Sequence, residues 1–220
     1  LLAALITLSL AAVAEGEDRP TWNIDVPVTA SFAAAETKYD GAIQVIAYNI
    51  ERGFYYQDVA NYIRKKRAEE PATVVLLSEC DRDHHRTGDI FVAQRLAREL
   101  EMNMVYVTEF IEYNDKTVIN QGDHGNAILS PFPLENVTVI RHTSGFSWQD
   151  YGHLRGEPRY GERVTVGATV LLPGGDKVRV YSAHLESNAG TFAKWEQMEE
   201  IARDTEYTPY PVVIGGDFNE

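Results

Sequence analysis

Apolar and polar residues along the chain repeat with two different periods, which separate strands from helices. Runs of β-branched and aliphatic residues at Ile43–Tyr48 and Thr73–Leu77 indicate strands, and the second run is apolar on both faces, as in a covered sheet. Further strands are predicted at residues 104–110, 127–129, 134–140, 163–172, 177–183 and 212–214. Helices are predicted at residues 57–70, around Val92, Leu96 and Leu100, and around Trp195, Met198 and Ile201.

The order of these elements indicates the fold class. Strands and helices alternate in the first half of the chain, and the turn at residues 173–176 joins two strands as an antiparallel hairpin. This mixture is typical of a layered α/β or α+β sandwich. Repeats and heptads, which would indicate a solenoid or a coiled coil, do not occur in the sequence.

Length and composition are those of one ordinary soluble domain. The chain has 220 residues, 44% of them hydrophobic and 24% charged, which excludes a collagen, a disordered tail or a polytopic membrane protein. Its net charge of −13 disfavours long-range attraction to nucleic acid, because cationic side chains supply that affinity. The single cysteine, Cys80, has no partner for an internal disulfide and is predicted to be a packed thiol.

The two ends of the sequence bear on location and completeness. Residues 1–14 carry no charge and finish in Ala12-Val13-Ala14, so they are predicted to be a signal peptide that lacks its N-terminal part. Residues 15–40 are predicted to be a linker or edge segment, and residues 211–220 a buried strand that runs into a loop. We therefore expect a secreted or secretory-lumen protein whose last strands are missing, with a truncated N-terminal membrane anchor as the alternative.

Polar residues stand at the ends of four predicted strands. Taken singly, each could make a local turn. Because ligands of helix-covered sheets collect at the carboxyl ends of strands, we instead expect these residues to converge. They are Asn49 and Glu51, Glu79, His184 and Glu186, and Asp217 and Asn219.

The side chains of this set predict an oxygen-ligand cation site with a histidine beside it. Carboxylate and amide oxygens suit Mg²⁺ or Mn²⁺, whereas zinc sites use several His or Cys, and neither HExxH nor paired-Cys spacing occurs. Mg²⁺ held by few carboxylates is typical of phosphoryl-transfer sites. The sequence also lacks a P-loop, GxGxxG and GxSxG, which disfavours nucleotide kinases, dehydrogenases and serine hydrolases.

Five sequence blocks in order resemble the signature of the endonuclease/exonuclease/phosphatase superfamily, which has the deoxyribonuclease-I-like fold. The resemblance covers residues 41–220, and the last block is its most specific part. The blocks are Ile46–Gly53 (IAYNIERG), Val74–Glu79 (VVLLSE), Gly125–Ser130 (GNAILS), Val180–Glu186 (VYSAHLE) and Ile214–Asn219 (IGGDFN).

The resemblance implies a two-sheet sandwich flanked by helices and a divalent-metal-dependent hydrolysis of phosphate esters. It implies that Asn49 and Glu79 form the metal site. Asp217 would orient or deprotonate the attacking water, and Asn219 would hold the phosphate or that water. His184 would donate a hydrogen bond or proton to the phosphoryl oxygens or leaving group.

Four further residues are candidate substrate contacts. Asn126 lies in the third block, and Arg163 stands where family members often carry an arginine. Trp148 and Arg155 belong to an aromatic and basic segment, residues 145–161, that could stack a base or meet a lipid headgroup. An ordinary surface loop is the alternative for this segment. The five other histidines (84, 85, 124, 142 and 153) match no block and are predicted to be surface or loop residues.

One departure from the family pattern leaves two classes of function open. The family's further strand with an Asp-His pair does not occur before residue 220. We expect a secreted phosphodiesterase, or nuclease-like hydrolase, that depends on Mg²⁺ or Mn²⁺ and acts on nucleic acid, a lipid headgroup or an inositol phosphate. Without the further strand, residues 1–220 by themselves are expected to be inactive. The alternative is a catalytically silent relative that acts as a binding module.

Overall fold

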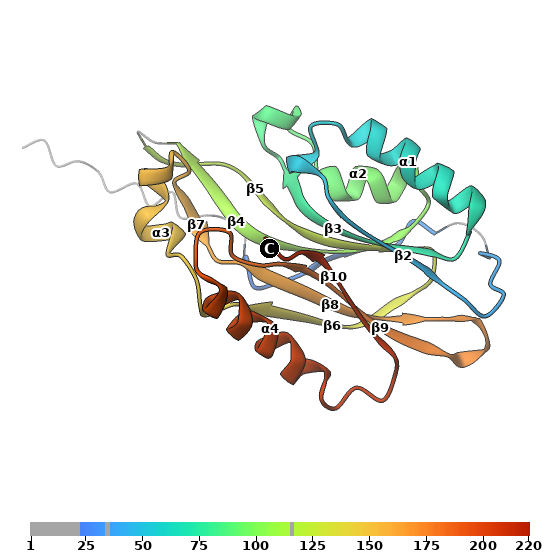
Figure 1. Ribbon diagram of the computed structural model, residues 1–220. Helices are drawn as coiled ribbons and strands as arrows, with labels where there is room; N and C mark the ends of the chain where they lie inside the picture. Colours follow the sequence, from blue (N-terminus) through green and yellow to red (C-terminus); the bar gives the residue numbers. More distant parts are fainter. Residues whose placement is uncertain (1–22, 34–35, 115–116) are drawn as a thin grey trace, which may run out of the picture.

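The computed structural model describes residues 23–33, 36–114 and 117–220, and its strands form two sheets packed face to face with helices outside (Figure 1). The predicted α/β sandwich flanked by helices is therefore confirmed. The predicted signal peptide at residues 1–14 lies outside the described residues. Within the described ranges, no helix combines the length and the apolar character needed to span a bilayer.

The first sheet has the strand order β1-β4-β5-β3-β2, and β7 also pairs with β4. Neighbours β2 and β3 are parallel, and the other pairs are antiparallel. Its strands are β1 (Val28–Ala30), β2 (Gln44–Asn49), β3 (Thr73–Arg82), β4 (Asn103–Asn114), β5 (Thr117–Ser130) and β7 (Arg159–Gly161).

The second sheet has the order β10-β9-β8-β6. The predicted hairpin is present, because β8 and β9 are antiparallel and joined by the short turn η4 (Pro173–Gly175). Strands β9 and β10 are parallel, so both end at the same edge of the sheet. The strands are β6 (Leu134–Arg141), β8 (Val164–Leu171), β9 (Lys177–His184) and β10 (Val212–Asp217).

Helices cover the outer face of each sheet (Figure 1). Helices α1 (Tyr56–Glu69) and α2 (Val92–Glu99) lie on the first sheet, and α4 (Thr191–Thr205) lies on the second. Short helical segments follow the strands at their carboxyl ends: η1 (Glu51–Gly53), η2 (His85–Thr87), α3 (Trp148–Tyr151) and η3 (Gly152–Arg155).

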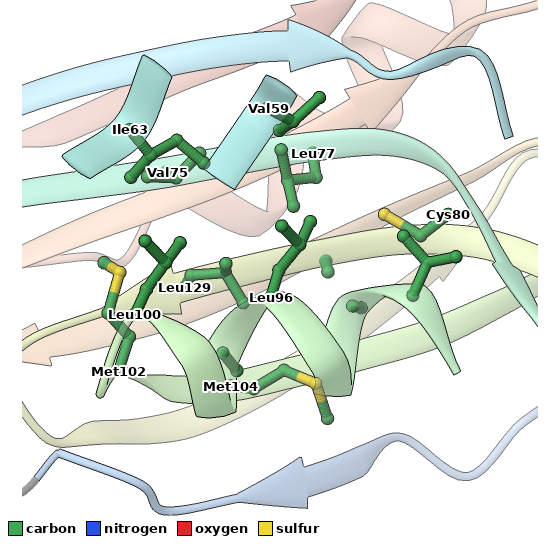
Figure 2. Packing of buried hydrophobic residues seen from close by; sticks show 14 of the residues in the cluster. Val59, Ile63, Val75, Leu77, Cys80, Leu96, Leu100, Met102, Met104 and Leu129 are labelled. Atoms are coloured by element: carbon green, nitrogen blue, oxygen red, sulfur yellow. The ribbon is translucent and has the colours of Figure 1, made fainter. Parts of the chain in front are cut away.

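The apolar alternation of β3 divides the core into layers. Val74 and Leu76 face the second sheet, whereas Val75 and Leu77 face α1 and α2 (Figure 2). Cys80 lies in the layer beneath the helices, where burial raises the pKa of its thiol well above the usual value. The predicted packed thiol is confirmed, and strand β3 is held from both faces.

The hairpin β4–β5 and segment 145–161 differ from the sequence-based expectation. Both strands are several residues longer than predicted, because ionisable side chains in their extensions find partners inside the protein instead of facing water: Glu112 pairs with His124, and Asp123 with Arg82 of β3. Segment 145–161 is no plain surface loop, since it contains α3, η3 and β7.

Candidate functional site

The predicted site residues meet at the carboxyl ends of strands from both sheets. Asn49 ends β2, His184 ends β9 and Asp217 ends β10. In the parallel pair of β9 and β10, His184 and Asp217 stand in register. Their approach follows from strand pairing, which brings residues from distant stretches of chain to one edge.

Glu79 reaches the site through a β-bulge in β3, whereas the apolar pattern predicts that it follows the end of the strand. The strand continues to Arg82, and its register against β5 shifts between Leu77 and Cys80. Glu79 lies in this irregularity with a φ of 57°. A bulge re-aims a side chain without ending the strand, which explains why the predicted end at Leu77 is wrong.

Asn49 holds the two acids of the site together. Its Nδ2 donates to Glu79 Oε1 at 3.1 Å and to Asp217 Oδ2 at 2.8 Å. Its Oδ1 accepts from the Glu51 amide N–H at 3.0 Å, which fixes the orientation of the amide group. The side chains of Glu79 and Asp217 are 23% and 28% exposed, so the acids remain open to a ligand.

His184 connects this pair of acids to a buried glutamate. Its Nδ1 lies 2.9 Å from Glu109 Oε2, and its Nε2 lies 4.0 Å from both Glu79 Oε1 and Asp217 Oδ2. A carboxylate only accepts hydrogen bonds, so Nδ1 carries the proton toward Glu109. Nε2 is therefore the ring atom on the side of Glu79 and Asp217.

Glu109 is a residue of the candidate site that the sequence interpretation missed. It is fully buried in β4, at a register shift between Thr108 and Phe110, and it continues the side of the strand that carries Val105 and Val107. Burial raises the pKa of its carboxyl, but His184 and Arg163 outweigh burial and hold the pKa at about 2. A charged residue on the inward side of a predicted strand is the signal that could have revealed it.

Arg163 lies against His184. Its Nη1 is 2.8 Å from Glu109 Oε1 and 2.8 Å from His184 Nε2, and its Nη2 donates to Ser187 Oγ at 3.0 Å. The guanidinium is buried, so its predicted contact with phosphate stays a prediction.

Asp217 is held in its ionised form. Partial burial raises the pKa of its carboxyl, but hydrogen bonds from Asn49 and from the Asn219 amide N–H outweigh burial and leave that pKa below its usual value. Asn219 donates its backbone N–H to Asp217 Oδ1 at 2.9 Å and its side-chain Nδ2 to the Leu185 carbonyl at 2.8 Å. Asn219 thus shapes the loop that carries Asp217, and its predicted contact with phosphate or water stays a prediction.

Left-handed backbone conformations gather at the site. Positive φ angles occur at four non-glycine residues in or beside it: Glu51 (48°), Arg52 (64°), Glu79 (57°) and Asn219 (53°). Each such residue costs roughly 1–3 kcal/mol and persists only where surrounding contacts enforce it. The conformations at Glu51 and Asn219 accompany backbone N–H bonds to Asn49 Oδ1 and Asp217 Oδ1.

The oxygen donors of the site fit a hard divalent cation. Within the part of the chain that the structure describes, no three His, Cys, Asp or Glu side chains are grouped to hold a metal ion. Glu79 and Asp217 supply two partly exposed carboxylates, which matches the few protein ligands that Mg²⁺ takes when water and phosphate complete its shell. Asn49 presents its nitrogen and not its oxygen to these acids, so its predicted metal contact stays a prediction.

Three predicted substrate contacts lie outside this group. Trp148 does not form an open stacking surface, because its ring is only 3% exposed and lies between Phe110 and Phe146, with centroids 5.7 and 5.0 Å away. Asn126 is buried as well and donates Nδ2 to the Val164 carbonyl at 2.8 Å. Arg155 is exposed, and its guanidinium lies 5.6 Å from the Phe146 ring centroid.

Two of the five histidines predicted to lie at the surface are buried. His124 is 2% exposed and its Nδ1 lies 2.8 Å from Glu112 Oε1, while His142 is 3% exposed and bridges Glu200 and Thr165. Both satisfy their ring nitrogens with partners distant in sequence, which residue pattern alone does not reveal. The prediction holds for His85 and His153, which are exposed, whereas His84 is half-buried.

The sandwich with helices outside and a polar site at the strand ends has the deoxyribonuclease-I-like architecture. A model of the endonuclease/exonuclease/phosphatase family matches residues 21–220. The chain therefore belongs to this family, whose members hydrolyse phosphoesters. No significant match occurs among curated proteins.

Solved structures share the fold at low sequence identity. An endonuclease/exonuclease/phosphatase from Beutenbergia cavernae aligns with a TM-score of 0.55 and 23% identity, over 80% of this chain and 47% of that chain. The human Nocturnin catalytic domain with bound sulfate aligns with a TM-score of 0.52 and 19% identity, over 81% of this chain and 64% of that chain. The 2′,3′-cyclic phosphatase ANGEL2 aligns with a TM-score of 0.51 and 18% identity, over 80% of this chain and 52% of that chain. This chain thus spans about half to two thirds of the length of these proteins.

Proposed function

We propose that this protein is a divalent-metal-dependent hydrolase of phosphate esters, with phosphodiesters as the favoured class. The observation that carries the proposal is the position of His184 Nε2, which lies 4.0 Å from both Glu79 and Asp217 at the open end of the strands. Phosphoryl transfer needs chiefly positioning and neutralised charge. The oriented histidine supplies positioning, and a cation held by the acid pair would neutralise charge, which favours an enzyme over a silent binding module.

Each side chain of the site has a distinct part in this proposal. Asp217, ionised at neutral pH, accepts a proton from the attacking water or orients that water. Glu109 holds Nδ1 of His184, and Nε2 would act on a phosphoryl oxygen or the leaving group once substrate replaces Arg163 Nη1 as its neighbour. Arg163 fixes Glu109 and His184 relative to one another.

Glu79, with Asp217 and Asn49 beside it, would hold the cation, which would be Mg²⁺ or Mn²⁺. The cation would supply positive charge to the phosphoryl oxygens, as in other phosphoester hydrolases. Two of the similar solved structures, one with bound sulfate and one a 2′,3′-cyclic phosphatase, are consistent with phosphate chemistry on this fold. A secreted location belongs to the same proposal and rests on residues 1–14 of the sequence alone.

Turnover of a generic substrate tests the chemistry before any natural substrate is known. The full-length protein should hydrolyse bis(p-nitrophenyl) phosphate with Mg²⁺ or Mn²⁺ and not after addition of EDTA. Asp217→Asn and His184→Gln should each lower kcat/KM by roughly 10²–10⁴-fold, the usual contribution of a proton-transfer group. Glu206→Gln, at an exposed position after α4, is the matched control and should leave turnover unchanged.

A panel of substrates then separates the substrate classes. Double-stranded DNA, sphingomyelin and inositol phosphates represent nucleic-acid, lipid-headgroup and polyol phosphoesters. Hydrolysis that persists in EDTA, or that is unaffected by Asp217→Asn, would contradict the proposed chemistry. Binding of a panel member without turnover in any metal would instead support the binding module.

A further inference from the structure

Trp148 is linked to His184 by two buried side chains, the carboxylate of Glu186 and the guanidinium of Arg163. Its indole Nε1–H donates to Glu186 Oε2 at 2.9 Å, and both side chains are almost completely buried. The cation beside that carboxylate is Arg163, whose Nε lies 3.7 Å from the same oxygen. Trp148, Glu186 and Arg163 therefore form a continuous row that ends at His184.

Glu186 is held on every side by the protein. Its Oε1 accepts the Asn188 amide N–H at 2.8 Å, and its own amide N–H donates to Gln197 Oε1 at 3.0 Å. Gly145 lies so close that a Cβ built there would stand 3.2 Å from the Glu186 Cγ and 3.3 Å from Oε2. The 145–161 segment, helix α4 and the chain that follows β9 thus all contact this one residue.

Arg163 is fixed between two carboxylates and two rings. Glu109 binds its Nη1 at 2.8 Å, while Glu186 faces its Nε from the other side. The rings of Phe110 and Trp148 lie 5.5 and 5.6 Å from its guanidinium carbon, within the range of a cation–π contact. Nε has no hydrogen-bond partner among the described residues, so the Glu186 charge and these rings are what hold that end of the group.

We propose that Trp148 and Glu186 are positioning residues for His184, acting through Arg163. This inference rests on the proposed function, because it assigns them to the orientation of the group that donates a proton. Trp148 fixes the Glu186 carboxylate, Glu186 fixes the Nε end of Arg163, and Arg163 Nη1 contacts both ring nitrogens of His184 at 2.8 and 3.1 Å. A small displacement of this row moves Nε2 away from Glu79 and Asp217, and such misplacements lower reaction rates strongly.

A positioning role and a purely structural role predict different kinetics. Trp148 is buried, so its contribution is to the geometry of the reacting groups and not to substrate affinity. Loss of positioning lowers kcat and leaves KM nearly unchanged, because the interaction is made in the transition state. Loss of packing alone lowers the free energy of unfolding without changing kcat of the folded enzyme.

Trp148→Phe removes the indole N–H and keeps an aromatic face beside Arg163. We expect kcat for bis(p-nitrophenyl) phosphate to fall about tenfold, with KM changed less than about twofold. Trp195→Phe is the matched control, because Trp195 is 58% exposed on α4, and it should leave both values unchanged. Equal kcat in the two variants would overturn the proposal, as would a change confined to KM.

Glu186→Gln tests the role of Glu186. It also provides a second variant in case Trp148→Phe does not fold. It retains an acceptor for Trp148 and removes the charge that faces Arg163. We expect a fall in kcat similar to that of Trp148→Phe. In the double variant, kcat should fall by less than the product of the two single effects, because both residues act through Arg163. Multiplicative losses would mean that the two residues act separately and would contradict the proposal.

NMR of the histidine ring gives a readout that needs no turnover. The ring ¹⁵N and ¹H signals of His184, assigned with His184→Gln, should shift in Trp148→Phe and Glu186→Gln and stay in place in Trp195→Phe. Unchanged His184 signals in all three variants would overturn the positioning role even if stability fell. Should the wild-type protein hydrolyse no substrate, the proposed function fails, while these signals still decide whether Trp148 and Glu186 position the ring.

Discussion

The side-chain nitrogen of Asn49 lies 2.8 Å from Asp217 Oδ2, although 168 residues separate the two along the chain. The same nitrogen also binds Glu79, so one amide joins two acids from opposite sheets of the sandwich. Each acid would repel the other without a donor or a cation between them. Binding of the proposed cation would therefore be coupled to the stability of this corner.

Asn49→Asp should make the folded protein dependent on divalent cations. The substitution replaces the donor with a third carboxylate, so we expect a loss of about 1–3 kcal/mol in the free energy of unfolding without metal. Urea unfolding in EDTA and in millimolar Mg²⁺ measures this loss and its recovery. Asn61→Asp, at an exposed position on α1, is the control. Equal stabilisation by Mg²⁺ in wild type and Asn49→Asp would contradict this coupling between residue 49 and the cation.

Glu109 should make folding sensitive to acid. Its folded pKa of about 2 is below its ordinary value of 4.5, so its stabilising effect is fully present above pH 4.5 and disappears as the pH falls toward 2. The shift corresponds to roughly 3 kcal/mol at neutral pH. The difference in the free energy of unfolding between wild type and Glu109→Gln, measured with urea, should therefore narrow as the pH falls from about 6 to about 2.5. A difference that stays constant with pH would show that the carboxyl is not held ionised.

His142 should contribute to stability and not to catalysis. Burial lowers the pKa of its ring despite the nearby Glu200, so the ring is neutral when folded and its stabilising effect is lost as the pH falls below 6.5. His142→Ala should lower the free energy of unfolding by about 1–3 kcal/mol at pH 7. The variant should also lose less of its free energy of unfolding than wild type between about pH 7 and 5.5. His153→Ala, at an exposed position, should change neither. A loss of kcat in folded His142→Ala would contradict this assignment.

Gly216→Ala should separate β10 from β9. Gly216 has a φ of 146°, and a Cβ there would stand 1.9 Å from the Ala183 carbonyl oxygen, which belongs to the neighbouring strand. We expect loss of activity together with more than about 4 kcal/mol of stability, since backbone must move. Gly190→Ala has open space around its Cβ and should be tolerated. Thermal unfolding of both variants makes the comparison.

Much of the fold could be predicted from the apolar pattern, because burial imposes that pattern directly. The run Thr73–Leu77 is apolar on both faces and lies between helices and the second sheet, as expected. Strand ends were harder to predict. A bulge lets β3 continue past Glu79, and bulges depend on pairing with β5, which local sequence does not contain.

Site residues that follow an apolar strand could be predicted from the sequence, whereas a site residue inside a strand could not. Asn49, His184 and Asp217 stand at strand ends and do converge. Glu109 interrupts an alternating strand, and only its partners across the sandwich, His184 and Arg163, explain its burial. The neighbouring aromatic and basic residues in sequence favour a substrate contact for Trp148, whereas tertiary packing turns its ring inward.

Asp217 and His184 stand side by side because β10 and β9 pair in parallel register. The spacing between this acid and the histidine is therefore a property of one strand pair. Any local opening of that pair would separate the two side chains while leaving Glu79 and Glu109 in place. Amide exchange along residues 212–217 would measure how often the pair opens.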